Sequence, residues 1–273
     1  ALLIYSTTYI LNSFYEIGDT IFLKIILIST PLSIVSFIDD YKNINQKIRY
    51  VCQLITGMIL IFNANFLDIN LINQNYFLYF ILLFIFLFLI TGLINIVNFM
   101  DGIDGLVLGV FAVIFSALTI YNDFNYIFFT SILFLFLKWN WNPAKLFIGD
   151  AGSIFLGTVY AGVIINSQDL TEAVSILLLG MPLILDSTFC LGWRFFNGFN
   201  IFKAHNMHLY QRLVKGGFSH KKVSLIYIFS VSFITLFYLL GNIYLELIAV
   251  IVTLIFGIFL NLKYASKLLE NNS

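Results

Sequence analysis

Residues 95–105 have the sequence Asn95-Ile-Val-Asn98-Phe-Met-Asp101-Gly102-Ile-Asp104-Gly105. They separate the apolar run from Tyr76 to Leu93 from another apolar run that begins at Leu106. A carboxylate at the centre of a bilayer costs roughly 2.5–3.5 kcal/mol on insertion scales. Two carboxylates between apolar runs therefore predict a polar cleft at a membrane surface, and the stretch is a candidate site.

The composition of the whole chain indicates a membrane protein. Of its 273 residues, 60% are hydrophobic, 18% are aromatic and 10% are charged, whereas soluble domains have about 25% charged residues. We therefore expect a polytopic integral membrane protein in contact with the lipid bilayer. The formal net charge is zero, so the bulk charge itself says nothing about nucleic acid. For a membrane protein of this composition we expect no nucleic-acid partner. Cys52 and Cys190 lie inside apolar runs, which predicts buried structural thiols rather than a disulfide or a zinc site.

Polar breaks divide the sequence into ten apolar segments. These are residues 1–14, 20–38, 48–64, 76–97, 105–121, 125–139, 153–167, 171–193, 223–241 and 244–263. Because a helix satisfies its backbone polar groups internally and crosses a bilayer in about 20 residues, we expect an all-α fold with about ten transmembrane helices. We expect one transmembrane domain over residues 1–273. The chain begins inside an apolar segment, which suggests that a natural N-terminal helix and loop are missing.

The basic residues predict the orientation of these segments. Thirteen of the fourteen lysines and arginines fall in one set of loops, and Lys24 alone falls in the other. The positive-inside rule assigns the basic set of loops to the cytoplasm. Five acids stand at helix–loop junctions on this side, namely Asp39, Asp40, Asp101, Asp104 and Asp150.

Asp39 and Asp40 end the apolar segment 20–38. Adjacent carboxylates repel one another unless a cation lies between them, so this pair is a candidate for metal binding or catalysis. The simpler alternative is a helix end with two solvated acids, balanced by Lys42 and Lys47.

Amides and carboxylates recur every three residues in the opening stretch, at Asn95, Asn98, Asp101 and Asp104. Because each step of three drifts by about 60° around an α-helix, the series cannot stay on one face. Gly102 and Gly105 predict a helix break that lets backbone approach a ligand closely. The alternative is an amide contact between helices followed by a solvated loop.

The junction that begins at Asn140 and contains Pro143 leads into a further apolar segment. Pro143 predicts a turn, and Asp150 stands where a helix N-cap belongs. Gly149 and Gly152 expose backbone N–H groups at a helix N-terminus, which is a favourable place for phosphate. N-capping by Asp150 is the structural alternative, and a metal-bound diphosphate would use both features.

The longest cytoplasmic loop contains the histidines of the chain. His205 and His208 are three residues apart, so they can share a helical face. Together with Arg212 they form a cationic patch, for which anion binding and lipid contact are both open. Asp186 lies inside an apolar segment, where we expect it to support Arg194 or another helix.

Together, the four junctions resemble the polyprenyl-phosphate N-acetylhexosamine-1-phosphate transferases, the superfamily that contains the bacterial phospho-MurNAc-pentapeptide translocase. The matching motifs are Phe37-Ile-Asp-Asp40, Asn95-x-x-Asn98-x-x-Asp101-Gly-x-Asp104-Gly105, Pro143-Ala-x-x-Phe-x-Gly149-Asp150-x-Gly-Ser153 and the histidine-containing loop. The loop pattern His205-Asn-Met-His208-Leu-Tyr-Gln-Arg212 is similar to Gram-negative initiators of O-antigen synthesis that use UDP-linked FucNAc, QuiNAc or GlcNAc.

The resemblance implies that Mg²⁺, or Mn²⁺ in its place, supports transfer of HexNAc-1-phosphate from UDP-HexNAc to undecaprenyl phosphate. UMP would be released, and an O-antigen-like cell-surface polysaccharide would be initiated. It also implies a bacterial inner-membrane location, an active site facing the cytoplasm and a homodimer. The implied catalytic residues are Asp39, Asp40 and Asp150, with Asp150 and Asn98 as metal ligands. The implied substrate-binding residues are Asp101, Asp104, Asn140, His205, His208 and Arg212.

Two alternatives from other classes stay open. An intramembrane Mg²⁺-dependent prenyltransferase would carry two motifs of the type N/D-D-x-x-D, and Asp39-Asp40-Tyr-Lys-Asn43 lacks the third acid. An ion-coupled transporter would place its acids near the bilayer midplane, whereas the acids of this chain gather at one face.

Overall fold

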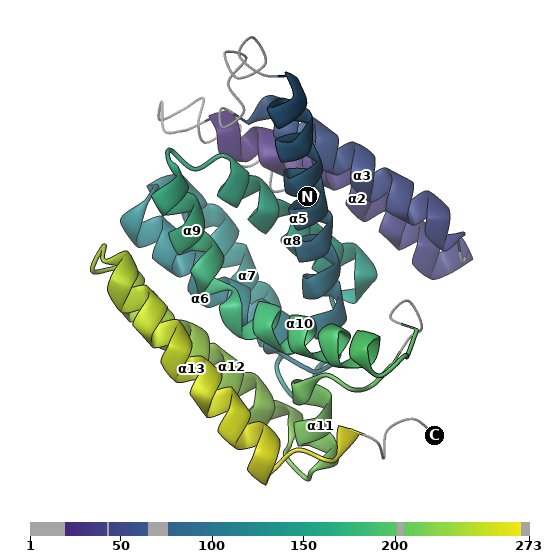
Figure 1. The fold of residues 1–273 in the computed structure, drawn as a ribbon, viewed down its shortest axis with the longest axis vertical. Coiled ribbons are helices and arrows are strands. Elements are labelled where there is room, and N and C mark those ends of the chain that lie inside the picture. Colours follow the sequence, from purple (N-terminus) through teal and green to yellow (C-terminus); the bar gives the residue numbers. More distant parts are fainter. Residues whose placement is uncertain (1–19, 43, 65–75, 201–204, 269–273) are drawn as a thin grey trace. The chain divides into compact units, whose positions relative to one another are not determined.

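The structure is a computed structural model that describes residues 20–42, 44–64, 76–200 and 205–268. Within these ranges the elements are helices, with no strand (Figure 1). They are α2 (Thr20–Lys42), α3 (Gln46–Asn63), α5 (Tyr76–Met100), α6 (Leu106–Tyr121), η1 (Phe124–Tyr126), α7 (Ile127–Asn140), α8 (Gly149–Ile165), α9 (Leu170–Leu179), α10 (Met181–Phe196), α11 (Leu209–Lys215), α12 (His220–Tyr238) and α13 (Ile243–Lys263). The predicted all-α fold is confirmed for this part of the chain.

The predicted count of about ten transmembrane helices is not supported. Among the described residues, four helices are long and apolar enough to cross a membrane, namely α2, α5, α12 and α13. Helices α9 and α10 add a fifth span if they are counted as one span that bends by 75°. The predicted segment 1–14 lies outside the described residues.

The overestimate has a physical reason. Helices α6, α7 and α8 have 16, 14 and 17 residues, and a span needs about 20. Twelve of the residues of α6 are buried inside the protein. An apolar run in the sequence does not distinguish a helix that faces lipid from a short helix that is covered by other helices.

The chain forms two compact units. Unit 1 comprises residues 1–98, 125–129 and 148–176, and unit 2 comprises residues 99–124, 130–147 and 177–273. The chain passes between the two units several times, so one domain over residues 1–273 stays a prediction.

In unit 1, helix α2 packs against α3 and α8. Helix α8 also lies very close to α5, since a Cβ atom on Gly157 would be 2.9 Å from the Cα atom of Ile94. Glycine permits this approach because it has no side chain, as is common where membrane helices pack. Aromatic rings fill part of the remaining core, where Phe129 contacts both Phe22 and Phe155.

In unit 2, helix α12 packs against α6 and α13, and α10 packs against α12 and α13. Figure 1 shows α12 and α13 side by side along the chain's yellow-green end. The short helix α11 is joined to α13 and to the segment after it through Arg212, whose guanidinium donates to the Asn261 side chain in α13 and to the Ser266 carbonyl (3.0 Å). These contacts fix α11, which directly follows the segment that contains His205 and His208 (the histidine segment).

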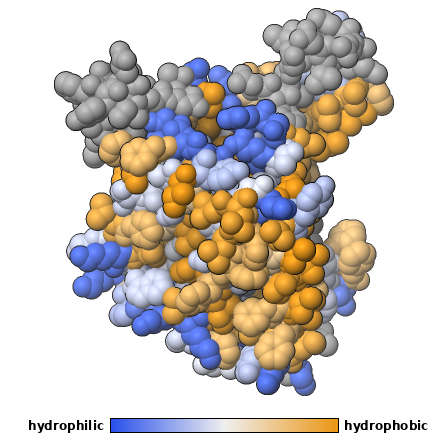
Figure 2. Space-filling view, turned by 90° about the vertical axis from the view of Figure 1, so that its left-hand side faces the viewer, coloured by the Kyte–Doolittle hydropathy of each residue, from blue (hydrophilic) through white to orange (hydrophobic). Residues whose placement is uncertain are grey.

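Apolar side chains cover much of the face seen in Figure 2. Helix α5 exposes Phe77, Phe84 and Phe88, each more than 70% accessible. Helix α13 exposes further large apolar side chains, including Ile255 and Leu262. Such surfaces on helices of spanning length are typical of lipid contact. The protein is an all-α, multi-pass membrane protein.

Candidate active site

Four helices of unit 1 bring polar residues together at their ends. Asp39 lies in the last turn of α2, Arg49 in the first turn of α3, Asn98 in the last turn of α5 and Asp150 in the first turn of α8. We refer to these four residues as the acidic cluster. The sequence places them in three separate motifs and a loop, and the packing of unit 1 brings them into contact.

Arg49 joins the two carboxylates of the acidic cluster. Its Nη1 atom donates to Oδ2 of Asp39 (2.8 Å) and to Oδ2 of Asp150 (3.1 Å). The side chain of Asp39 is 14% exposed, that of Arg49 is 25% exposed and that of Asp150 is 39% exposed. The cluster is therefore partly shielded from water at Asp39, where charges interact more strongly, and open to solvent at Asp150.

Asn98 completes the acidic cluster. Its Nδ2 atom donates to Oδ1 of Asp150 and to Oγ of Ser153, both at 3.0 Å. One turn earlier, Asn95 and Gln53 exchange amide hydrogen bonds of 3.0 and 3.4 Å. The alternative of an amide contact between helices is thus confirmed at Asn95, while Asn98 contacts the carboxylate of Asp150.

Asp40 is exposed and lies beside the start of α8, since a Cβ atom on Gly149 would be 3.5 Å from its Oδ2 atom.

The N-capping alternative for Asp150 is wrong. Helix α8 begins at Gly149 with Ile148 at the cap position, so Asp150 lies inside the first turn. A negative charge there is stabilised by the positive end of the helix dipole.

The acidic cluster has a donor set that fits Mg²⁺. This ion prefers carboxylate and amide oxygens, and it often binds through one or two carboxylates together with substrate phosphates. The carboxylates of Asp39 and Asp150 already converge on one positive group, the Nη1 atom of Arg49. Two carboxylates that share one cation are a suitable starting arrangement for such an ion.

Unit 2 contains the second half of the opening stretch. Helix α5 ends at Met100 and α6 begins at Leu106, with Gly105 at φ = 75°, so the predicted helix break is confirmed. Gly102 lies under Tyr210, whose Oη donates to the Phe99 carbonyl (3.0 Å). A Cβ atom on Gly102 would lie 2.1 Å from this Oη atom, so the contact requires glycine.

Asp104 is tied to the loop that follows α7. Its Oδ2 accepts from Nδ2 of Asn142 (2.7 Å) and from the Ala144 N–H (3.2 Å), and it lies 3.6 Å from Nδ1 of His220. Burial alone would raise the pKa of Asp104, but the two hydrogen bonds and the charge of His220 outweigh burial and leave the pKa below its ordinary value. The carboxylate is therefore charged and held in place.

Asn140 joins the same two loops from the other side. Its Oδ1 accepts from the Gly105 N–H (2.9 Å) and its Nδ2 donates to the Leu146 carbonyl (2.9 Å). The side chain is buried. Asp101 is half-buried, and its charge acts on Tyr210: burial first, and then the charges of Asp186 and Asp101, raise the pKa of that phenol.

Asp186 connects three helices of unit 2. Its Oδ1 accepts from the Leu209 N–H (2.6 Å), and its Oδ2 accepts from the Tyr210 N–H (3.2 Å) and from Oη of Tyr227 (2.6 Å). Asp186 therefore binds the N-terminus of α11, and the predicted support of another helix is confirmed. The alternative partner Arg194 is not among these donors to Asp186, and its guanidinium donates to the Asn200 carbonyl (2.5 Å).

The predicted helical face shared by His205 and His208 is wrong, because both residues precede α11. Their rings nevertheless stack, with centroids 5.0 Å apart and an interplanar angle of 28°. Burial lowers the pKa of each ring to about 4, and the charge of Arg194 contributes for both. The two histidines therefore offer neutral ring nitrogens near pH 7 rather than positive charges.

Arg212 is the remaining member of the predicted cationic patch. It is buried, and its Nε donates to the Met207 carbonyl (3.1 Å). Burial lowers the pKa of Arg212, and the charge of Asp186 partly offsets this lowering. Since its donors also bind Ser266 and Asn261, Arg212 holds the chain around α11 in place.

Sequence reasoning missed the roles of Arg49 and Tyr227. Arg49 was counted with the positive-inside residues, and its distance from Asp39 and Asp150 along the chain left no local signal. The prediction of a buried thiol is confirmed for Cys190 and wrong for Cys52, which is half-buried.

The geometry defines a class: a multi-pass helical membrane protein with carboxylates, an amide and an arginine gathered at helix ends. The sequence profile described as glycosyl transferase family 4 matches residues 22–168, more than half of the chain. The chain belongs to this family. The matched segment contains all four residues of the acidic cluster.

Curated relatives show similarity at moderate identity. A probable undecaprenyl-phosphate N-acetylglucosaminyl 1-phosphate transferase of Bacillus subtilis (strain 168) is 27% identical over 247 residues, which cover 82% of this chain and 67% of that protein. A phospho-N-acetylmuramoyl-pentapeptide-transferase of Prochlorococcus marinus is 30% identical over 207 residues, 65% of this chain and 55% of that protein. A phospho-N-acetylmuramoyl-pentapeptide-transferase of Staphylococcus epidermidis is 27% identical over 191 residues, which cover 60% of this chain and 58% of that protein. The chain thus spans between about half and two thirds of the length of these relatives.

Proposed function

We propose that this chain is a polyprenyl-phosphate N-acetylhexosamine-1-phosphate transferase. It would transfer HexNAc-1-phosphate from a UDP-sugar to undecaprenyl phosphate, release UMP and initiate a cell-surface polysaccharide. The observation that carries the proposal is the acidic cluster, in which Asp39, Asp150 and Asn98 converge within the segment matched to glycosyl transferase family 4. The names of the relatives support the lipid acceptor and the aminosugar donor.

The reaction joins two anions. An oxygen of the lipid phosphate attacks the β-phosphorus of the UDP-sugar, the bond from that phosphorus to the bridging oxygen breaks, and UMP leaves with the bonding electrons. Positive charge must therefore be held where the phosphates meet. When bound at Asp150 and Asn98 with Asp39 or Asp40 assisting, Mg²⁺, or Mn²⁺ in its place, would neutralise the diphosphate and stabilise the departing UMP.

The residues of the acidic cluster have separate roles in this proposal. Arg49 balances the charges of Asp39 and Asp150, and its guanidinium fork has further N–H donors suited to phosphate oxygens. Asp39 or Asp40 accepts the proton of the lipid phosphate or orients that phosphate for attack. Attack by one of these carboxylates, with a covalent intermediate, is the competing route.

The residues of unit 2 complete the proposal. Asp101 would position the nucleotide, and His205 and His208 would offer neutral nitrogens to the sugar or phosphate. Asp104, Asn140 and Arg212 would act as positioning residues, because their polar groups bind the loops next to them. The proposal also includes an active site that faces the cytoplasm of a bacterial inner membrane, the side to which the positive-inside rule assigns basic loops.

UMP release tests the proposal directly. The full-length protein, purified in detergent, is incubated with undecaprenyl phosphate, Mg²⁺ and each of several UDP-HexNAc donors. We expect UMP and a lipid-linked HexNAc diphosphate with at least one donor, and loss of both products after chelation of the metal. Absence of UMP with every donor contradicts the transferase, and the donor that works identifies the sugar. Membership of glycosyl transferase family 4 favours this reaction over a prenyltransferase or an ion-coupled transporter.

A further inference from the structure

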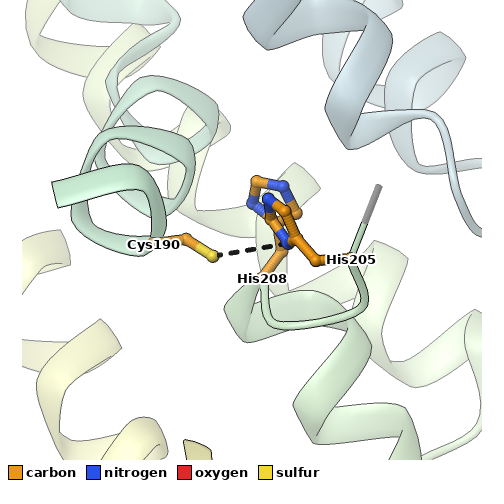
Figure 3. Close-up of side chains that lie close together, drawn as sticks. All are labelled: Cys190, His205 and His208. Atoms are coloured by element: carbon orange, nitrogen blue, oxygen red, sulfur yellow. Dashed lines mark hydrogen bonds between the residues drawn. The ribbon is translucent and has the colours of Figure 1, made fainter. Parts of the chain in front are cut away.

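The side chains of Cys190, His205 and His208 point toward one another in unit 2 (Figure 3). Cys190 belongs to α10, and the two histidines belong to the segment before α11. One ligand atom from each residue lies within 4.8 Å of the others, and Sγ of Cys190 is 3.9 Å from Nδ1 of His205. In the part of the chain that the structure describes, no other group of three such side chains is this compact.

We propose that Cys190, His205 and His208 form a binding site for a thiophilic transition-metal ion of the Zn²⁺ type. Thiolate and neutral imidazole are preferred ligands of Zn²⁺, and three protein ligands leave a fourth position for water or an anion. With the ion bound, His205 and His208 would act on the sugar or phosphate through that fourth position rather than by direct contact. On binding, the metal–sulfur bond forms, the S–H bond breaks and its proton passes to solvent. No oxidant or reductant takes part.

His208 supplies an independent observation for this site. The residue is 2% exposed, and its Nδ1 atom has no hydrogen-bond partner among the described residues. A buried polar atom is normally paired. A metal would satisfy the ring in either orientation: bound to Nδ1, or bound to the other nitrogen with Nδ1 donating to Asp186.

Asp186 lies next to His208 and can accept a hydrogen bond from its ring when the metal binds the other ring nitrogen. Its Oδ1 lies 3.8 Å from Nδ1 of His208, and its own position is fixed by hydrogen bonds from Leu209, Tyr210 and Tyr227. A carboxylate behind a ligand histidine orients the ring in many zinc sites. The network around Asp186 therefore acts as the support of the metal site.

The surrounding charge determines which metals can bind. The buried guanidinium of Arg194, which contacts Met207 and Asn200, opposes a cation. Bond formation to the thiolate sulfur offsets that repulsion for soft ions, and it offers little to Mg²⁺ or Ca²⁺, which prefer oxygen. The site thus differs in selectivity from the acidic cluster, whose ligands are oxygen atoms.

Cobalt binding tests the proposal without any measurement of transferase activity. Chelator-treated full-length protein in detergent is titrated with Co²⁺ and followed by absorption spectroscopy. We expect one Co²⁺ per chain, with a thiolate charge-transfer band and the visible bands of a four-coordinate ion. Zn²⁺ should displace it, and a large excess of Mg²⁺ should not. Absence of these bands overturns the proposal.

The two cysteines provide a matched pair of variants. Cys190→Ser should lose the charge-transfer band, whereas Cys52→Ser should keep it, and bands that persist in Cys190→Ser overturn the site. If Cys190→Ser does not fold, as judged by gel filtration, His205→Ala decides the question. That variant should weaken Co²⁺ binding by about tenfold or more, and an unchanged affinity also overturns the site. Because the readout is metal binding, a failed transferase assay would not affect this result.

Discussion

The acidic cluster of unit 1 and the Asp186 network of unit 2 use carboxylates in opposite ways. Asp39 and Asp150 share one arginine, and the side chain of Asp150 is 39% exposed. Asp186 is 7% exposed, and its two oxygens accept three hydrogen bonds from the protein. The difference shows that an acid beside an apolar run takes its role from its partners. A carboxylate that solvent reaches can bind a ligand, and a buried carboxylate whose oxygens accept several hydrogen bonds stabilises the fold.

The largest expected effect is on activity, at the exposed carboxylate of Asp150. Asp150→Asn should lower the rate of UMP release by about a thousandfold or more, because the amide removes the charge that would hold the metal and the diphosphate. The matched control is Asp169→Asn, an exposed acid of unit 1 that caps α9 by accepting from the Glu172 N–H (2.8 Å). The control should keep its activity. Retained activity in Asp150→Asn would remove Asp150 from the metal site.

The next effect is on stability, at the buried carboxylate of Asp186. Asp186→Ala leaves three donors without their acceptor, and we expect a loss of about 3 kcal/mol in the free energy of unfolding, since buried unpaired groups cost about 1–3 kcal/mol each. Asp186→Asn keeps one acceptor oxygen and should lose less. Thermal unfolding in detergent measures both. If Asp186→Ala unfolds at the wild-type temperature, the network does not stabilise the fold.

The histidine segment beside the Asp186 network should respond to pH. The pKa of His208 in the folded protein is about 4, below the value of about 6.5 in an unfolded chain. The unfolded state therefore binds more protons below pH 6.5, so stability falls between pH 6.5 and pH 4 and is independent of this group above that window. Between pH 7 and pH 5 the loss should be about 2 kcal/mol.

His208→Asn, which stays neutral, should flatten this pH dependence in chelator-treated protein. Thermal unfolding at several pH values makes the comparison. An unchanged slope in the variant would show that the dependence comes from other groups.

The smallest effect is on stability at the acidic cluster. Arg49→Ala should lower the free energy of unfolding by about 1 kcal/mol or less, because partly exposed ion pairs contribute about 0–1 kcal/mol. Thermal unfolding compares it with Asp186→Ala. An equally large loss in both variants would mean that the acidic cluster also serves the fold, and the contrast between the two units would disappear.

Parts of the site could be predicted because they depend on neighbours in the sequence. Gly102 and Gly105 indicated the end of a helix, and the chain is non-helical from residue 101 to 105. The motifs that contain Asp39, Asn98 and Asp150 were recognised individually, and these residues meet in unit 1. The contact of Arg49 with both carboxylates left no such signal, since Asp150 lies 101 residues further along the chain.

The sequence by itself determined that this is a helical membrane protein of the glycosyl transferase type, because apolar content, helix breaks and motif spacing are local properties of the chain. Only the tertiary structure decided how many helices are long enough to span, which carboxylates are exposed to solvent and which are buried, and that Cys190 lies beside two histidines. Those features depend on which segments pack together. Packing is set by the burial of whole helix faces and by hydrogen bonds between distant residues, which the spacing within any one segment does not record.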